Sequence, residues 1–157
     1  MKIVLIVIGK TTESYFKKSE EEYLKRLKKY IKLDYITIPD IKNTKKLSEL
    51  EQKKQEGEKI ISKIPSGSHL VLLDDKGMEK SSMQFSSYIE KKMVHGTKNL
   101  VFIIGGPYGF SEEIYAMAKE KLSLSKLTFS HQMIRTIFFE QIYRCFTIMN
   151  NEPYHHE

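Results

Sequence analysis

Two side chains that could move a proton or hold a negative charge, His131 and Arg135, lie four residues apart towards the end of the sequence. The segment around them, from about residue 131 to residue 150, has the apolar periodicity of a helix, and Ser130 is placed to cap its start. This spacing puts both side chains on one side of the helix. Arg135 falls within the apolar arc, where a buried guanidinium needs an anionic partner. A carboxylate, an RNA phosphate or the carboxylate of a cofactor could meet it, and a structural salt bridge is the simplest alternative.

Further polar groups follow in the same helix and at the end of the chain. Glu140 and Arg144 lie four residues apart on the side of the helix opposite His131. The simplest interpretation of this pair is a surface ion pair. Within one subunit, the two side chains cannot share a pocket with His131. The chain ends with Tyr154-His155-His156-Glu157, and termini usually fray. These groups could instead form a lid over a base, because stacking and proton transfer need an aromatic ring and imidazoles. We expect Pro153 to direct this tail back towards a ligand crevice.

Glycines and aspartates gather in two loops that follow predicted strands. Gly105, Gly106 and Gly109 allow the backbone to approach a ligand closely. Their spacing fits neither the dinucleotide-binding motif nor the phosphate-binding loop, so a plain tight turn is an equal alternative. Asp74 and Asp75 could accept hydrogen bonds from a ribose or an ammonium group, although acidic turn residues are more often only solvated.

Strands that alternate with helices must position these loops. The apolar patterns predict strands over residues 1–8, 33–38, 69–73, 99–104 and 122–124, and helices over residues 14–31, 45–64, 81–93, 111–119 and 131–150. This alternation predicts an α/β fold with a mostly parallel sheet covered on both faces. Ligands bind such sheets beyond the carboxyl ends of the strands. The loops at residues 74–77, 105–109 and 125–130 should therefore share one crevice.

Length and composition limit the alternatives. The 157 residues are the usual size of one domain, so we assign residues 1–157 to a single domain. The longest aliphatic run, residues 3–8, is far shorter than the roughly 20 residues that span a bilayer, which predicts a cytoplasmic protein. Cys145 is the only cysteine, so neither a disulfide within the chain nor a thiolate zinc site is indicated. A net charge of +6 favours a polyanionic partner such as nucleic acid, although charge alone is weak support.

Short motifs recur along the whole chain in the order and at the length of one known family. They are Met1-Lys2-Ile3 with Gly9-Lys10, Glu22-Tyr23 with Arg26, Glu56-Gly57, Leu73-Asp74 with Gly77, the run 102–109, the run 122–125, the run 131–135, the run 140–144, and Pro153-Tyr154-His155. In these motifs the sequence resembles the RlmH family, the SPOUT-class methyltransferases of pseudouridine N3 in large-subunit ribosomal RNA. Because the match covers essentially the whole chain, it is far more specific than any single motif.

The resemblance implies a SPOUT fold, a mostly parallel sheet flanked by helices whose C-terminal part threads a loop to form a trefoil knot. S-adenosylmethionine would bind in the knot in a bent conformation. The positions that match the family's cofactor site are Leu73, Gly105, Leu124, Ser125, Lys126, Leu127, Thr128 and Phe129. The family acts as a homodimer on a pseudouridine in a stem-loop of 23S ribosomal RNA within the ribosome.

Two residues depart from the pattern of the family. Ser130 stands where proline is expected, and His156 stands where the tail usually carries arginine or lysine. Histidine is only partly charged at neutral pH, so the second departure leaves open how the tail neutralises a nearby phosphate.

The implied reaction is an in-line methyl transfer, for which the protein must chiefly position two reactants. The N3 imino group must also lose its proton, which requires a base or a group that stabilises the anionic ring. The candidate catalytic residues are His131, Arg135, Tyr154 and His155, and Arg144 is the candidate RNA-binding residue. Which of them takes the proton stays open. A non-catalytic ribosome-binding protein and a generic nucleotide-binding α/β enzyme are the alternatives.

The final helix also predicts a homodimer. Its apolar arc, which includes Ile142 and Cys145, is wider than one small sheet can cover. We therefore expect this helix to form the interface between two subunits.

Overall fold

A parallel sheet forms the centre of the molecule, as the alternation of apolar runs with helices predicts. The computed structural model describes residues 1–42 and 44–155, and in these ranges five strands pair in the order β2-β1-β4-β3-β5, all parallel. The strands are β1 (Lys2–Ile8), β2 (Lys32–Ile38), β3 (Ser68–Glu79), β4 (Asn99–Ile104) and β5 (Glu120–Ser123). The central strands β1 and β4 are apolar over nearly their whole length because both of their faces are buried.

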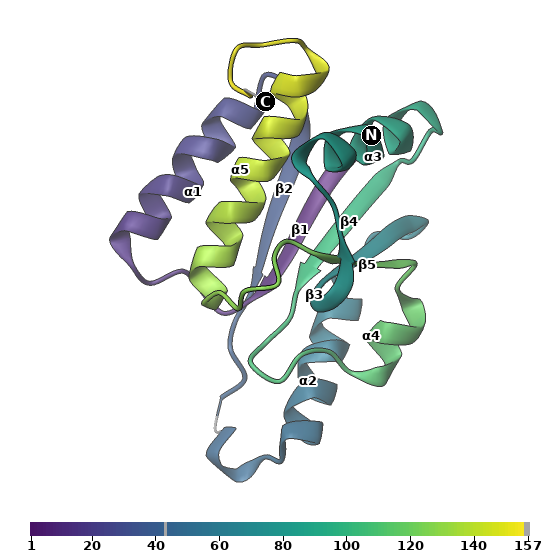
Figure 1. Cartoon of the computed structure of the whole chain (residues 1–157). Helices are drawn as coiled ribbons and strands as arrows, with labels where there is room; N and C mark the ends of the chain where they lie inside the picture. The colour runs from purple at the N-terminus through teal and green to yellow at the C-terminus, as the bar shows by residue number, and fades with distance from the viewer. Residues whose placement is uncertain (43, 156–157) are drawn as a thin grey trace.

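Helices cover both faces of the sheet (Figure 1). One layer consists of α1 (Ser14–Leu27), α3 (Ser82–Val94) and α5 (His131–Met149), and the other consists of α2 (Glu49–Ile61) and α4 (Glu112–Met117). Successive side chains of β1 alternate between the two layers: Ile3 and Leu5 join the core under α5, while Val4 and Ile6 join the core under α4. The predicted sheet flanked by helices is confirmed, and the threading of the C-terminal part through a loop stays a prediction.

Serine side chains fix where four of the helices begin. The hydroxyl of each accepts a hydrogen bond from the backbone amide three residues later, at Ser48, Ser81, Ser111 and Ser130. The cap at Ser130 was predicted. Helix α2 starts later than predicted because Ser48 and Glu51 form a reciprocal capping box, and a short 3-10 turn at Thr44–Lys46 precedes it. Helix α1 ends at Leu27, four residues earlier than predicted.

Strand β3 replaces the loop that was predicted at residues 74–77. The strand runs on to Glu79, and its register against β5 shifts between Leu73 and Met78. Beyond Leu73 it therefore leaves β4 and follows β5 alone. Gly77 makes this crossing possible, because a Cβ atom there would lie 2.5 Å from the carbonyl carbon of Leu122. Asp74 and Asp75 consequently lie in β3, within the register shift against β5. Strand β5 itself begins two residues before its predicted start.

The apolar arc of α5 is covered within a single chain. This helix lies between α1 and α3 and packs against both (Figure 1). Ile142 and Cys145 are 0% exposed and belong to the core. The two residues are therefore not available to a partner subunit, because α1 and α3 extend the cover that the sheet provides. Only another side of α5 could form the predicted interface.

Candidate functional site

A cavity of about 290 Å³ opens at the carboxyl ends of β4 and β5, beside the point at which β3 leaves β4. Its walls come from residues 73–75, 104–107, 109–110, 115, 122–125, 127–129, 131 and 134. Most of these side chains are apolar, with a few carboxylate, hydroxyl and imidazole groups among them, which is the usual make-up of a small-molecule site. The three segments that the sequence indicated thus meet at one place.

The structure brings together most of the residues that resemblance assigns to the cofactor. Seven of the eight line the cavity, namely Leu73, Gly105, Leu124, Ser125, Leu127, Thr128 and Phe129. Lys126 does not. Its side chain is 87% exposed, and its ammonium group lies 3.8 Å from the carboxylate of Glu79.

The glycine-rich loop after β4 forms a tight turn at the rim of the cavity. The amide of Gly109 donates to the carbonyl of Gly106 over 3.1 Å, and Gly109 has a φ of 80°, which favours glycine. A Cβ atom on Gly105 would lie 3.0 Å from the ring of Phe110 and 3.2 Å from the carbonyl oxygen of Gly109. A larger side chain at Gly105 would therefore displace the turn that shapes the cavity.

Glu56 of α2 lies directly behind this turn, and sequence reasoning gave it no role beyond its motif. It is 3% exposed, and a Cβ atom on Gly106 would overlap its carboxylate. Gln52 donates to one carboxylate oxygen over 2.9 Å, and the other oxygen has no hydrogen-bond partner within the described ranges. Burial raises the pKa of Glu56. The sequence did not indicate that Glu56 is buried, because most residues of α2 are polar.

Asp74 presents a negative charge to the cavity. Tyr115 donates to one of its oxygens over 2.7 Å, and the amide of Lys76 donates to the other over 2.8 Å. Burial opposes the charged form, but these hydrogen bonds lower the pKa of Asp74 below its usual value. Burial and the hydrogen bond that Tyr115 donates to Asp74 raise the pKa of Tyr115 to about 12. Asp74 is therefore ionised at neutral pH and fixed in place.

His131 lines the same cavity at the first turn of α5. Burial lowers the pKa of its imidazole, the positive charge of Arg135 lowers it further, and the charge of Asp40 opposes the shift. The imidazole is therefore mainly neutral at neutral pH. A neutral imidazole at the wall of a cavity can accept a proton from a bound molecule.

Arg135 lies in the core and does not line the cavity. Its side chain is 1% exposed, and the guanidinium donates to the carbonyl of Ile8 over 2.6 Å and to the hydroxyl of Thr11 over 3.0 Å. The same hydroxyl donates to the buried carboxylate of Glu20 over 2.7 Å. The anionic partner of Arg135 is therefore a carboxylate, that of Glu20, and the hydroxyl of Thr11 bridges the two charged groups. Arg135 joins the loop after β1 to α1 and α5.

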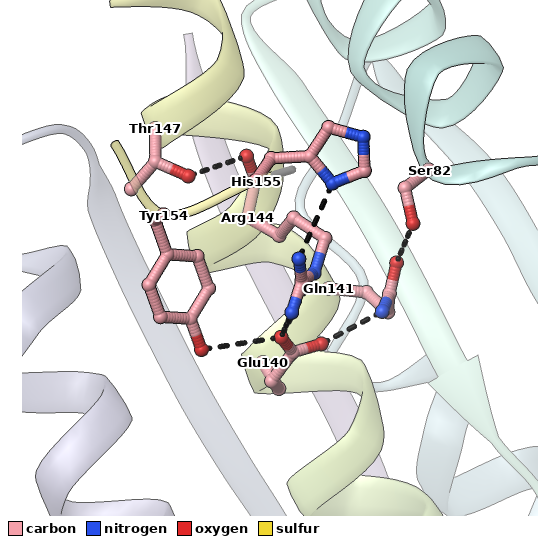
Figure 2. A network of polar contacts seen from close by, with 7 residues as sticks. All are labelled: Ser82, Glu140, Gln141, Arg144, Thr147, Tyr154 and His155. Atoms are coloured by element: carbon pink, nitrogen blue, oxygen red, sulfur yellow. Dashed lines mark hydrogen bonds and ion pairs between the residues drawn. The ribbon is translucent and has the colours of Figure 1, made fainter. Parts of the chain in front are cut away.

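The described part of the tail is packed against α1 and α5. The carboxylate of Glu152 accepts a hydrogen bond from Tyr30 over 2.6 Å, and Tyr154 donates to Glu140 over 3.3 Å (Figure 2). Arg144 donates twice to the same Glu140 oxygen, over 3.0 and 2.6 Å. Nη1 of Arg144 lies 3.2 Å from Nδ1 of His155. His156 and Glu157 lie outside the described residues.

One chain does not bring this cluster to the cavity. Among the residues of α5, the cavity is lined by His131 and Ile134, and neither Tyr154 nor His155 lines it. The tail contacts Glu140 and Arg144, which follow His131 by nine and thirteen residues, or about 13 and 20 Å along the helix. The expected return of the tail to the crevice is therefore not met within a single subunit.

The described residues were also searched for metal sites and for membrane-spanning helices. They contain no group of three or more His, Cys, Asp or Glu side chains that could hold a metal ion. No helix in the same ranges is long and apolar enough to cross a membrane.

Comparisons with known proteins give one consistent result. A family model described as "Predicted SPOUT methyltransferase" matches residues 1–155. The chain is 62% identical to a protein of Parabacteroides distasonis and 56% identical to one of Flavobacterium johnsoniae, in each case over 157 residues and the full length of both chains. Both relatives are named ribosomal RNA large subunit methyltransferase H.

A solved structure supports the fold alone. It is that of a probable methylase family protein from Haemophilus influenzae, with a TM-score of 0.50 and 15% sequence identity. The similarity covers 99% of this chain and 70% of the other.

Proposed function

The chain belongs to the RlmH family of SPOUT methyltransferases, and from this membership we propose that it transfers a methyl group from S-adenosylmethionine to N3 of a pseudouridine in 23S ribosomal RNA. The names of the relatives support ribosomal RNA as the substrate, and the resemblance of the motifs supports the cofactor and the target atom. The observation that carries the proposal is the cavity that the three predicted segments build together. Such an enzyme would work in the cytoplasm, where ribosomes are.

The residues around the cavity fit S-adenosylmethionine. A volume of about 290 Å³ is at the lower end for small-molecule sites, which favours a compact, bent ligand. Leu73, Leu124 and Phe129 offer apolar walls to an adenine ring, while the backbone at Gly105 is open to close approach. The ionised Asp74 can accept hydrogen bonds from ribose hydroxyls or an ammonium group.

Positioning and proton removal are the tasks left to the chain. S-adenosylmethionine, when bound, supplies an electrophilic methyl group and a thioether that leaves without needing a proton. The walls of the cavity would hold the reactants in line, and the apolar side chains of Leu122, Leu124 and Phe129 would limit the access of water to them. His131, whose mainly neutral imidazole lines the cavity, and His155 of the tail are the two candidates to accept the N3 proton. Arg135 acts as a positioning residue, since it fixes the first turn of α5 to the loop after β1.

A homodimer would supply the tail that each cavity lacks. Met133, Ile137 and Ile148 form a stripe along the outward side of α5. At 100° per residue, the stripe lies within an arc of about 100° of the helix surface. These three side chains do not belong to the core, and Met133 is 41% exposed. If two copies of α5 pack antiparallel through this stripe, the C-terminal half of one helix lies beside the N-terminal half of the other. The tail of each subunit would then reach the cavity of its partner.

Ile137→Glu should disrupt this dimer without unfolding the subunit. A two-fold interface contains the substituted residue twice, so we expect the dissociation constant to rise at least about 30-fold, or about 2 kcal/mol. Sedimentation at several concentrations measures this change, and Val94→Glu, at an apolar residue that is 78% exposed on α3, is the control. A dimer of Ile137→Glu with the stability of the control variant would exclude this side of α5 as the interface.

Gly105→Val tests the cavity itself. The added methyl groups would press on Phe110 and the turn at Gly109, so we expect the dissociation constant for S-adenosylmethionine to rise at least about tenfold, or 1.4 kcal/mol. Isothermal titration calorimetry measures the affinity, and thermal unfolding checks that the variant is folded. Lys126→Ala is the matched control, because Lys126 matches the family's cofactor positions but does not line the cavity.

Two outcomes of that titration count against the proposal. Unchanged affinity in folded Gly105→Val would place the cofactor elsewhere. If the wild-type protein itself binds no S-adenosylmethionine, a non-catalytic ribosome-binding role becomes the better explanation of the basic surface.

A further inference from the structure

A groove of about 590 Å³ lies at the C-terminal end of α1, away from the cavity. We call it the α1 groove and define it by its lining residues, which are Glu22, Lys25, Arg26, Lys28, Lys29 and Tyr143. Tyr143 belongs to α5, so the groove runs between the two helices. The N-terminal ends of α1 and α5 are joined by Gln132, which accepts hydrogen bonds from the amides of Thr12 and Glu13. The helices therefore run in the same direction, with the cavity near one end and the groove near the other.

The charge of the groove is strongly positive. Four cations line it against one carboxylate, that of Glu22, which accepts a hydrogen bond from Arg26 over 2.8 Å. Lys29 lies 3.5 Å from Glu152. Lys25 and Lys28 form no ion pair within the described residues, and both are exposed. Basic residues do stabilise the C-terminal end of a helix, where the helix dipole is equivalent to a charge of about −0.5. Four cations are more than this charge requires.

Aromatic rings fix the arginines of this surface and connect the groove to the tail. The guanidinium of Arg26 lies 5.7 Å from the ring centre of Tyr23 and 5.6 Å from that of Tyr143. The ring of Tyr143 packs edge-on against Tyr154, with centres 4.8 Å apart. Arg144 in turn lies over the ring of Tyr154 at 4.8 Å. A continuous array of contacting guanidinium and phenol groups, in the order Arg26, Tyr143, Tyr154 and Arg144, thus leads from the groove to the tail.

We propose that the α1 groove binds the sugar-phosphate backbone of the substrate RNA next to the modified nucleotide. The proposal rests on the proposed function, because it takes ribosomal RNA as the substrate. Unpaired lysines suit phosphates, and planar guanidinium groups held by rings lose little freedom when they bind them. Tyrosine rings beside these cations favour single-stranded RNA, whose bases can stack on them. In the antiparallel dimer, the groove and the tail of one subunit would present the RNA to the cavity of its partner.

Neutralising the two unpaired lysines tests the groove. In Lys25→Gln/Lys28→Gln, we expect the KM for ribosomes to rise about tenfold or more at physiological salt, with kcat and the affinity for S-adenosylmethionine unchanged. The slope of log KM against log salt should fall by about 2, since each lost phosphate contact removes about 1. Labelled-methyl transfer to ribosomes over a range of salt concentrations measures both effects.

The matched control is Lys54→Gln/Lys59→Gln, which removes two exposed lysines from α2 on the other face of the sheet. The control should keep the wild-type KM and salt slope. If the α1 groove variant behaves as this control does, or if it loses cofactor affinity instead of ribosome affinity, the groove does not bind the RNA. Absence of methyl transfer by the wild-type protein would overturn the proposed function, so the two failures are distinguishable.

Discussion

Deletion of residues 154–157 should lower methyl transfer to ribosomes by at least about 100-fold, the lower limit for the loss of a general base. Tyr154 and His155 are the described groups of the tail that could stack on a base or take its proton. The deletion leaves Glu152 bonded to Tyr30, so the end of α5 stays anchored. Cofactor affinity and dimerisation should change little, because the cavity and the outward stripe of α5 do not include the tail.

A complementation experiment shows which cavity the tail serves. A subunit without residues 154–157 has an intact cavity, whereas a Gly105→Val subunit has an intact tail. If tails act on the partner, a mixture of the two subunits should recover about a quarter of the wild-type activity, because half of the dimers are mixed and each has one complete site. The assay uses a cofactor concentration well below the dissociation constant of Gly105→Val, and if each tail acts on its own cavity, the mixture shows no more activity than its two components measured separately. Full activity of the truncated protein alone would mean that the tail has no role.

Arg135→Met should reduce the free energy of unfolding by about 3 kcal/mol, as removal of one partner from a buried charged network does. The carbonyl of Ile8 and the hydroxyl of Thr11 lose their donor, and the buried Glu20 loses the nearest opposing charge. Methionine fills much of the same volume, so the effect reports mainly on polar contacts. Denaturation by urea measures it, with Arg26→Met as the surface control, for which a change within about 0.5 kcal/mol is expected.

The pH dependence of this loss follows from Glu20. Burial raises the pKa of Glu20 above its ordinary value, and hydrogen bonding to Thr11 and the charge of Arg135 limit the rise. A carboxyl group with a raised pKa stabilises the fold below its unfolded pKa, and this contribution is lost as the pH rises through the folded pKa. Without Arg135 the ionised form is less tolerated, so the loss should be larger at about pH 8 than at about pH 5. Equal losses at both values would show that Glu20 is not coupled to Arg135.

The sequence predicted those parts of the fold that local patterns determine. The apolar runs of β1 and β4 indicated strands with two covered faces, and Ser130 marked the start of α5 correctly. The residues after Leu73 looked like a turn because aspartates and a glycine follow one another there. They extend β3 instead, because Gly77 allows a close crossing of β5 that no local pattern reveals.

The candidate site was predictable in its loops and less so in its charged residues. Seven of the eight positions that the resemblance implies for the cofactor line the cavity, and the exposed Lys126 does not. Arg135 was expected to meet an anion, yet its contact with Glu20 through Thr11 depends on residues more than 100 positions earlier. The buried Glu56 and the separation of the tail from the cavity likewise follow from packing between distant segments.

Methylation of ribosomal RNA by this protein can be measured with purified components. Purified protein is given S-adenosylmethionine with a labelled methyl group, together with either 70S ribosomes or separated subunits from cells that lack this gene. We expect label in 23S ribosomal RNA of the 70S particles, close to one methyl group per particle, and recovery of the label as N3-methylpseudouridine after digestion. Absence of label from 23S ribosomal RNA in 70S particles and in separated subunits alike, with the cofactor bound and the protein folded, would contradict the account.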